Sequence, residues 1–192
     1  MLEAGFDNEK YLALQSEHIE KRIKQFGGKL YLEFGGKLFD DYHAARVLPG
    51  FLPDSKLKML LQLRDRAEIV IVINSVDIEK SKVRLDIGIT YDMDVLRLID
   101  AFRNYGLYVG SVVLSMYNNQ PAVQAYERRH TEQGIRVYRH YDIEGYPREL
   151  DMVISEQGYG KNDYIETTRE LIVVTAPGPG SGKMATCLSQ LY

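Results

Sequence analysis

The pattern of hydrophobic positions divides this chain into alternating extended and helical segments. Residues 69–73 read Ile-Val-Ile-Val-Ile. A short run that is apolar at every position is typical of a central strand covered on both faces of a parallel sheet. Residues 94–105 instead carry apolar residues every three or four positions, which predicts an amphipathic helix. Both patterns recur along the chain.

These two periods predict an ordered series of elements. We expect helices over residues 7–26, 40–46, 54–66, 94–105 and 121–133, and again from residue 184. We expect strands over residues 29–34, 68–74, 107–114, 135–140, 150–154 and 171–175. Residues 75–92 read as a long polar loop, and residues 155–169 as a glycine-containing loop followed by a turn of helix.

Helix and strand therefore alternate almost throughout, which is typical of the α/β class. We predict a mainly parallel, doubly wound sheet with helices on both faces. In such a sheet the loops that follow the strands meet at one edge, which is the edge where these folds bind ligands.

The loop after the last predicted strand carries the clearest chemical signal. Residues 171–175 run into Ala-Pro-Gly-Pro-Gly-Ser-Gly-Lys before helix-forming sequence resumes. A strand, a glycine-rich loop and a helix form the layout of a phosphate-binding site, because glycines let backbone N–H groups converge on an anion. The predicted phosphate-binding residues here are Gly178, Gly180, Ser181, Gly182 and Lys183.

This loop is P-loop-like without matching the P-loop pattern. Pro177 occupies the position of the first glycine, and Met184 stands where a hydroxyl would bind Mg²⁺. The dinucleotide pattern fails as well, because its last glycine would fall on Lys183. A purely structural glycine-rich turn with a solvated lysine is the alternative.

The combination of glycine and lysine recurs in other loops expected at the same edge. Gly35, Gly36 and Lys37 follow the first predicted strand, and residues 158–161 read Gly-Tyr-Gly-Lys. Several such loops at one edge favour an anion-binding rim more than any single loop does. We therefore include Gly35, Gly36 and Lys37 among the predicted phosphate-binding residues.

Three acidic residues are candidates for a magnesium site. Asp92 and Asp94 resemble a carboxylate pair, and Asp40 follows the first glycine loop; carboxylate oxygens are ligands that Mg²⁺ prefers. The simpler explanation is that acidic residues favour the first turn of a helix. Arg84 and Asp86 lie in the long polar segment, where solvated side chains are the simpler explanation too.

Composition narrows the class of protein. A chain of 192 residues that is 45% hydrophobic can bury one substantial core, so we expect a single domain over residues 1–192. A net charge of −3 offers no general attraction to nucleic acid or an anionic membrane. The single cysteine excludes an internal disulfide, and neither a signal-peptide layout nor a membrane-length apolar run is present. We expect a cytoplasmic protein, and a homo-oligomer is compatible with these features.

Several long strings give the chain a specific resemblance. They are Phe-Gly-Gly-Lys-Leu-Phe-Asp-Asp-Tyr-His-Ala from residue 34, Arg-Val-Leu-Pro-Gly-Phe from 46, Gly-Ile-Thr-Tyr-Asp from 88, and the segments 158–169 and 175–190. In these strings the chain resembles the bacterial Domain of Unknown Function 1846 family. The resemblance covers nearly the whole chain and implies no reaction and no catalytic residues.

Members of that family are much longer, and Tyr192 follows Lys183 after only about the shortest length of an ordinary helix. We therefore expect the amino-terminal part of a longer natural protein, with the carboxyl-terminal remainder as a partner. Two functions stay open. One is a nucleotide- or phosphometabolite-dependent cytoplasmic enzyme whose glycine loop holds phosphate, with Mg²⁺ on Asp92, Asp94 or Asp40. The other is a non-catalytic ligand-sensing or assembly module with a structural glycine-rich turn.

Overall fold

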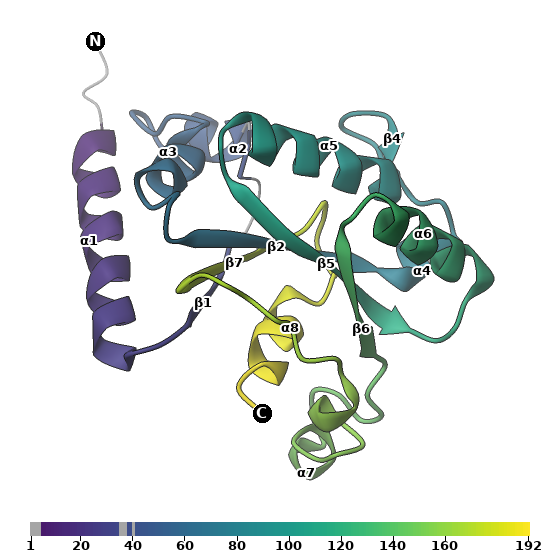
Figure 1. Cartoon of the computed structure of the whole chain (residues 1–192). Coiled ribbons are helices and arrows are strands. Elements are labelled where there is room, and N and C mark those ends of the chain that lie inside the picture. The colour runs from purple at the N-terminus through teal and green to yellow at the C-terminus, as the bar shows by residue number, and fades with distance from the viewer. Residues whose placement is uncertain (1–4, 35–37, 40) are drawn as a thin grey trace.

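The structure is a computed structural model, and it describes residues 5–34, 38–39 and 41–192 (Figure 1). Gly35, Gly36, Lys37 and Asp40 lie outside the described residues. The elements in chain order are α1 (Asn8–Phe26), β1 (Leu30–Glu33), α2 (Tyr42–Val47), α3 (Ser55–Gln62), β2 (Ala67–Asn74), α4 (Ser75–Glu79), β3 (Val83–Arg84), β4 (Ile89–Thr90), α5 (Tyr91–Asn104), β5 (Tyr108–Tyr117), α6 (Pro121–Glu132), β6 (Arg136–Tyr141), α7 (Leu150–Val153), the 3-10 helix η1 (Tyr159–Lys161), β7 (Leu171–Thr175) and α8 (Lys183–Ser189).

The main sheet has five strands in the order β1-β7-β2-β5-β6, and every neighbouring pair is parallel. The predicted α/β fold with a mainly parallel sheet is confirmed. The last strand, β7, lies between β1 and β2. After β6 the chain therefore crosses back past β5 and β2 to reach it. The helix after β2 packs into one core and the helix after β7 into the other, and such a divergence leaves a crevice at the carboxyl edge of the strands.

The two faces of the sheet are covered unequally. Ile69, Ile71 and Ile73 of β2 belong to a large core with residues of α1, α3, α5 and α6. The alternate residues Val70 and Val72 belong to a smaller core, which α8 and the segment before β7 complete. Figure 1 shows α3, α5 and α6 on one side of the sheet and α8 on the other. Each fully buried aliphatic side chain stabilises the fold by about 2 kcal/mol.

The helix α1 lies where the sequence predicts, whereas α5 begins three residues earlier than predicted and α3 ends four residues earlier. The Asp7 side chain accepts a hydrogen bond from the Lys10 N–H at the start of α1, and Gly27 closes that helix in the left-handed conformation with φ 61°. Pro121 occupies the first turn of α6. No helix in the described part of the chain combines the length and the apolar character needed to cross a membrane.

Two predicted elements after residue 149 are wrong. The predicted strand at residues 150–154 is a helix, α7 (Leu150–Val153), in which Val153 alone is buried. A short apolar run suits a strand or a helix equally well from sequence, and one-sided burial suits a helical turn. Residues 163–168, expected to contain a turn of helix, form neither helix nor strand. The buried carboxylate of Glu68 holds this segment by accepting a hydrogen bond from the Thr168 N–H at 2.7 Å.

The long polar segment at residues 75–92 is also more regular than predicted. It forms α4, the antiparallel hairpin of β3 and β4, and the first residues of α5, which begins at Tyr91. Apolar residues do alternate with polar ones from residue 83 to residue 89, the period of a strand. That alternation predicts a single strand, whereas residues 85–88 form the turn between β3 and β4.

Candidate functional site

The glycine loop at residues 176–182 lies over the carboxyl ends of neighbouring strands. Asn74 Nδ2 at the end of β2 donates to the Gly180 carbonyl at 3.3 Å, and Ser115 Oγ on β5 donates to the Ser181 carbonyl at 2.6 Å. In a trans peptide the C=O and the following N–H point in opposite directions. The N–H groups of Ser181 and Gly182 therefore point away from the side chains that hold the loop, and no described residue accepts a hydrogen bond from either of them.

Each glycine of this loop has a structural reason to be glycine. A Cβ on Gly178 would lie 2.1 Å from Cε1 of Tyr91, the first residue of α5. Gly180 and Gly182 have φ angles of 71° and 89°, which favour glycine. The glycines alone therefore do not indicate a ligand, and the argument for one rests on the side chains around the loop.

Lys183 is the first residue of α8, and its side chain is mostly buried. Its Nζ atom lies 3.8 Å from Glu33 Oε1 at the end of β1, too far for a strong hydrogen bond. Lys183 thus crosses the carboxyl edge of the sheet toward β1 and remains in a cavity rather than in open solvent.

That cavity, which we call the β7-loop cavity, has a volume of about 630 Å³. It lies between the glycine loop, the β3–β4 hairpin, α5 and the segment before α2. Its lining combines an apolar group with three cationic side chains. The lining residues are Leu38, Phe39, Arg84, Asp86, Ile87, Ile89, Tyr91, Arg97, Leu98, Thr175, Ala176, Pro177, Gly178, Pro179 and Lys183.

Two arginines of the cavity are held by one buried carboxylate. Arg84 Nη1 donates to Asp94 Oδ2, and Arg97 Nε donates to Asp94 Oδ1 at 2.7 Å. Arg84 also donates from Nη2 to Asp86 Oδ2 at 2.7 Å and from Nε to Asp86 Oδ1 at 3.2 Å. Burial alone would lower the pKa of Arg84, but the hydrogen bonds to Asp86 and Asp94 outweigh it and raise that pKa. Arg84 is thus a fixed positive charge at the cavity wall.

The structure does not bring the predicted magnesium ligands together. Asp94 is engaged by two arginines, and Asp92 lies two residues earlier on the same helix, about 200° away around its axis. The negative charge of Asp92 acts on the other side of α5, where burial first and Asp92 second raise the pKa of Tyr126. Within the described residues there is no group of three or more His, Cys, Asp or Glu residues that could hold a metal. Asp40 lies outside them.

The second glycine and lysine loop, at residues 158–161, has a different setting. It follows α7 instead of a strand, and a Cβ on Gly158 would lie 2.2 Å from the Met152 carbonyl oxygen. The Nζ atom of Lys161 lies 4.8 Å above the ring of Tyr141. Both distinctive residues of this loop therefore contact protein, and neither lines the β7-loop cavity.

Sequence reasoning missed Tyr91 and Arg97 and treated Arg84 and Asp86 as solvated. Residues 83–89 gave no clear signal, because their alternation predicts one strand with Arg84 and Asp86 on the same side, whereas residues 85–88 form the turn of the hairpin. Cys187, close to Lys183 on α8, is not a candidate nucleophile, because burial raises the pKa of its thiol to about 12.

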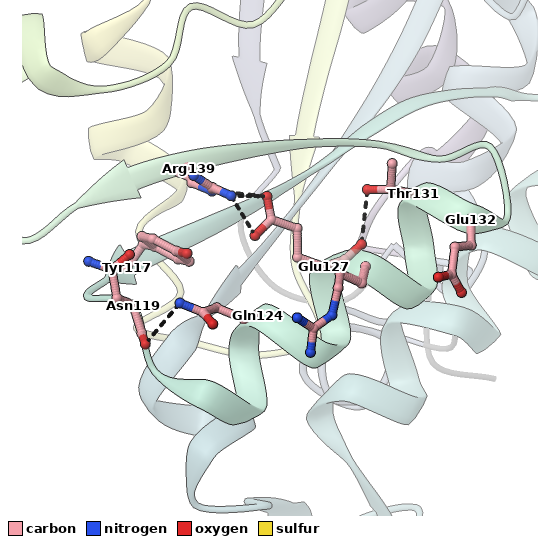
Figure 2. A pocket seen from close by; sticks show the side chains of 8 residues that line it. Tyr117, Asn119, Gln124, Glu127, Thr131, Glu132 and Arg139 are labelled. Carbon is pink, nitrogen blue, oxygen red and sulfur yellow. Dashed lines mark hydrogen bonds and ion pairs between the residues drawn. The ribbon is translucent and has the colours of Figure 1, made fainter.

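A second cavity of about 490 Å³, the α6 cavity, lies beside α6 and the ends of β5 and β6 (Figure 2). Its lining is Tyr117, Asn119, Gln124, Glu127, Arg128, Thr131, Glu132 and Arg139. Figure 2 shows the guanidinium of Arg139 meeting the Glu127 carboxylate through two bonds, at 2.9 and 3.0 Å. Arg128 and Glu132 also line this cavity, so its formal charges are two positive and two negative.

Comparison with known proteins places the chain in a family. The family model described as "Domain of unknown function DUF1846, N-terminal" matches residues 4–192. The UPF0371 protein of Streptococcus pyogenes serotype M5 (strain Manfredo) is 60% identical over 188 residues, which are 98% of this chain and 38% of that protein. A UPF0371 protein of Streptococcus equi subsp. zooepidemicus (strain MGCS10565) is 59% identical over 192 residues, 100% of this chain and 39% of that protein. The chain thus spans less than two fifths of the length of these relatives, whose names state no activity.

Proposed function

The chain belongs to the family described as Domain of unknown function DUF1846, N-terminal, and we propose that within it the β7-loop cavity binds a phosphorylated small molecule, a nucleotide or a phosphometabolite. One observation carries the proposal: Arg84, Arg97 and Lys183 come from three separate elements and line one cavity at the carboxyl edge of a parallel sheet. Cations brought together in this way supply the charge that a phosphate group needs.

Each cation has a distinct part in this proposal. Lys183 provides a compact charge beside the glycine loop, while the planar guanidinium groups of Arg84 and Arg97 match the geometry of phosphate oxygens. Gly178 also lines the cavity, whereas Gly180, Ser181 and Gly182 do not, so the donors in this proposal are the three cationic side chains. The pairs with Glu33, Asp86 and Asp94 hold the cations in place before a ligand arrives.

The same binding step would serve an enzyme or a ligand-sensing module. The engagement of Asp94 by Arg84 and Arg97 favours the sensing module, because it withdraws one of the carboxylates predicted to hold Mg²⁺. An effect of Mg²⁺ on ligand affinity would favour the enzyme instead. The binding site is the same for both, so the first experiment concerns binding.

The test is isothermal titration calorimetry on the full natural chain. The titrants are inorganic phosphate, ribose 5-phosphate and nucleoside monophosphates, with and without Mg²⁺. We expect Lys183→Ala to weaken binding at least about tenfold, the loss typical of a charge-assisted contact. The free energy of unfolding of this variant should differ from that of the wild type by less than about 1 kcal/mol, because the Lys183–Glu33 ion pair that it loses is long. Lys161→Ala is the matched control, since Lys161 also follows a glycine loop but contacts Tyr141.

Two results would overturn the proposal. One is that none of the phosphorylated compounds binds the folded wild-type protein. The other is that Lys183→Ala and Lys161→Ala bind a phosphorylated compound equally well, because binding would then lie elsewhere on the molecule.

A further inference from the structure

The β7-loop cavity is much larger than a phosphate group requires. Its volume of about 630 Å³ falls within the range of about 300–1,000 Å³ that is common for small-molecule sites. The three cations account for only part of its lining. The chemistry of the remaining lining therefore indicates which kind of group the phosphate is attached to. This inference rests on the proposed function.

That remaining wall is apolar and comes from three segments. Phe39 precedes α2, Ile87 and Ile89 belong to the β3–β4 hairpin, and Leu98 belongs to α5. Phe39 is held by ring contacts with Phe102 and Tyr105, at centroid distances of 4.8 and 5.9 Å. An apolar surface that is fixed in this way favours a ligand part with an apolar face, because burying such a face is favourable without further ordering of the wall.

The same half of the cavity also contains polar groups. Asp86 and Arg97 both line it, and both have side chains that are about two fifths exposed, at 41% and 43%. Both groups already have partners within the protein, since Asp86 accepts from Arg84 and Arg97 donates to Asp94. A heteroaromatic ring can pack a flat face on Phe39, a ring contact that an alkyl chain does not offer, and its polar edge can face the exposed part of Asp86.

We infer that the ligand is a nucleotide, with its base against the wall of Phe39, Ile87, Ile89 and Leu98 and its phosphate beside Lys183. A sugar phosphate would leave this apolar wall in contact with water. An alkyl phosphate would place its chain against that wall without a ring to pack on Phe39. Both remain as outcomes of the test.

The experiment compares ligands that share a phosphate and differ in the rest. Calorimetric titrations use adenosine, guanosine and uridine monophosphate, together with ribose 5-phosphate and hexyl phosphate. We expect at least one nucleotide to bind about tenfold or more tightly than ribose 5-phosphate, from the burial of the base. Hexyl phosphate should bind more weakly than that nucleotide.

Two variants of the hairpin provide a matched pair. Ile87→Ser changes a side chain that lines the cavity, whereas Leu85→Ser changes a side chain that is 95% exposed and does not line it. Both positions are exposed enough to leave the fold intact. We expect Ile87→Ser to weaken nucleotide binding several-fold and to leave ribose 5-phosphate binding unchanged, and Leu85→Ser to change neither.

The outcomes separate the two proposals. If ribose 5-phosphate or hexyl phosphate binds as tightly as every nucleotide, and Lys183→Ala still weakens that binding, the nucleotide inference is overturned and the phosphate site stands. Equal effects of Ile87→Ser and Leu85→Ser on nucleotide affinity would also overturn the inference. If no phosphorylated compound binds, both the inference and the proposed function fail.

Discussion

The β7-loop cavity and the α6 cavity are built from similar residues but in different ways. Each contains an arginine paired with carboxylates. In the first, the side chains of Arg84 and Asp94 are 9% and 0% exposed; in the second, those of Arg139 and Glu127 are 41% and 16% exposed. The Arg84–Asp94 pair is therefore buried away from water, whereas the Arg139–Glu127 pair is partly exposed, and the two pairs should contribute differently to stability.

The two cavities also differ in how the chain assembles them. Most of the α6 cavity comes from one helix, in which Gln124, Glu127, Arg128 and Thr131 are near neighbours along the sequence. The β7-loop cavity needs segments that lie far apart in sequence. Arg84 and Arg97 come from neighbouring elements, but Lys183 reaches them only because the last strand returns into the sheet, and the proposed ligand site depends on this arrangement.

Removing the carboxylate that pairs with the arginine of each cavity should give the largest difference in stability between the two regions. Asp94→Ala removes the buried carboxylate that Arg84 and Arg97 share and leaves Arg84 with the more exposed Asp86 alone, so the cost should approach about 3–5 kcal/mol, the cost of breaking a buried ion pair. Glu127→Ala leaves Arg139 free to be solvated and should cost less than about 1 kcal/mol. Urea unfolding of both variants measures these costs. Equal costs would show that burial does not separate the two ion pairs.

Substituting a glycine beside each cavity with alanine should destabilise the protein for a different physical reason in each case. Gly178→Ala pushes a Cβ into the Tyr91 ring and should destabilise the protein by about 1–3 kcal/mol. Gly134→Ala, just after α6, meets no atom within 4 Å but has a φ of 76°, so its cost of about 1–2 kcal/mol comes from the backbone.

A second substitution distinguishes these two causes. In a Tyr91→Ala background the space beside residue 178 opens, so Gly178→Ala should become nearly neutral while the cost of Gly134→Ala stays the same. Unfolding curves of the single and double variants give both coupling energies. A Gly178→Ala cost that persists without the tyrosine ring would contradict the contact between the loop and α5.

Acid should destabilise the protein through a buried histidine of β6. Burial lowers the pKa of His140 on β6 from 6.5 to about 4, against a hydrogen bond with the Asp163 carbonyl that raises it. The folded pKa is below the unfolded one, so the stability from neutral His140 is complete above pH 6.5 and is lost as the pH falls toward 4. At pH 5 the loss is about 2 kcal/mol relative to pH 7.

The variant His140→Gln should lose less stability between pH 7 and pH 5 than the wild type does, as measured by urea unfolding at each pH. Some pH dependence will remain, because burial also lowers the pKa of His130 on α6. Parallel curves for the wild type and the variant would show that His140 does not carry the effect.

The parts of the fold that periodicity predicts are those with long, regular burial. The continuous apolar run of β2 and the stripe of α5 each allow one solution, since buried strands and amphipathic helices differ in period. The four residues of α7 are too few to show a period, and the strand predicted there was wrong. The β3–β4 hairpin was missed because its strands have only two residues each, too few to show a period.

The sequence predicted the glycine loop and Lys183 of the candidate site but not the residues that pack around them. Glycine and lysine at residues 178–183 indicated the loop, because phosphate sites use those residue types. Tyr91 and Arg97 carry no motif, and their roles follow from packing against Gly178 and Asp94. The phosphate-binding residues and the magnesium ligands remain predictions, and Gly35, Gly36, Lys37 and Asp40 lie outside the described residues.

The position of β7 also governs when the sheet can be completed. In the described sheet β1 has β7 as its one neighbour, although more than a hundred residues separate them in the chain. As the chain emerges from the ribosome, β2, β5 and β6 can pair in turn, while the amino-terminal strand waits for residues that are synthesised near the end of this stretch. The earliest strand to be made is the last to join the sheet, and its arrival coincides with that of the loop beside the cavity.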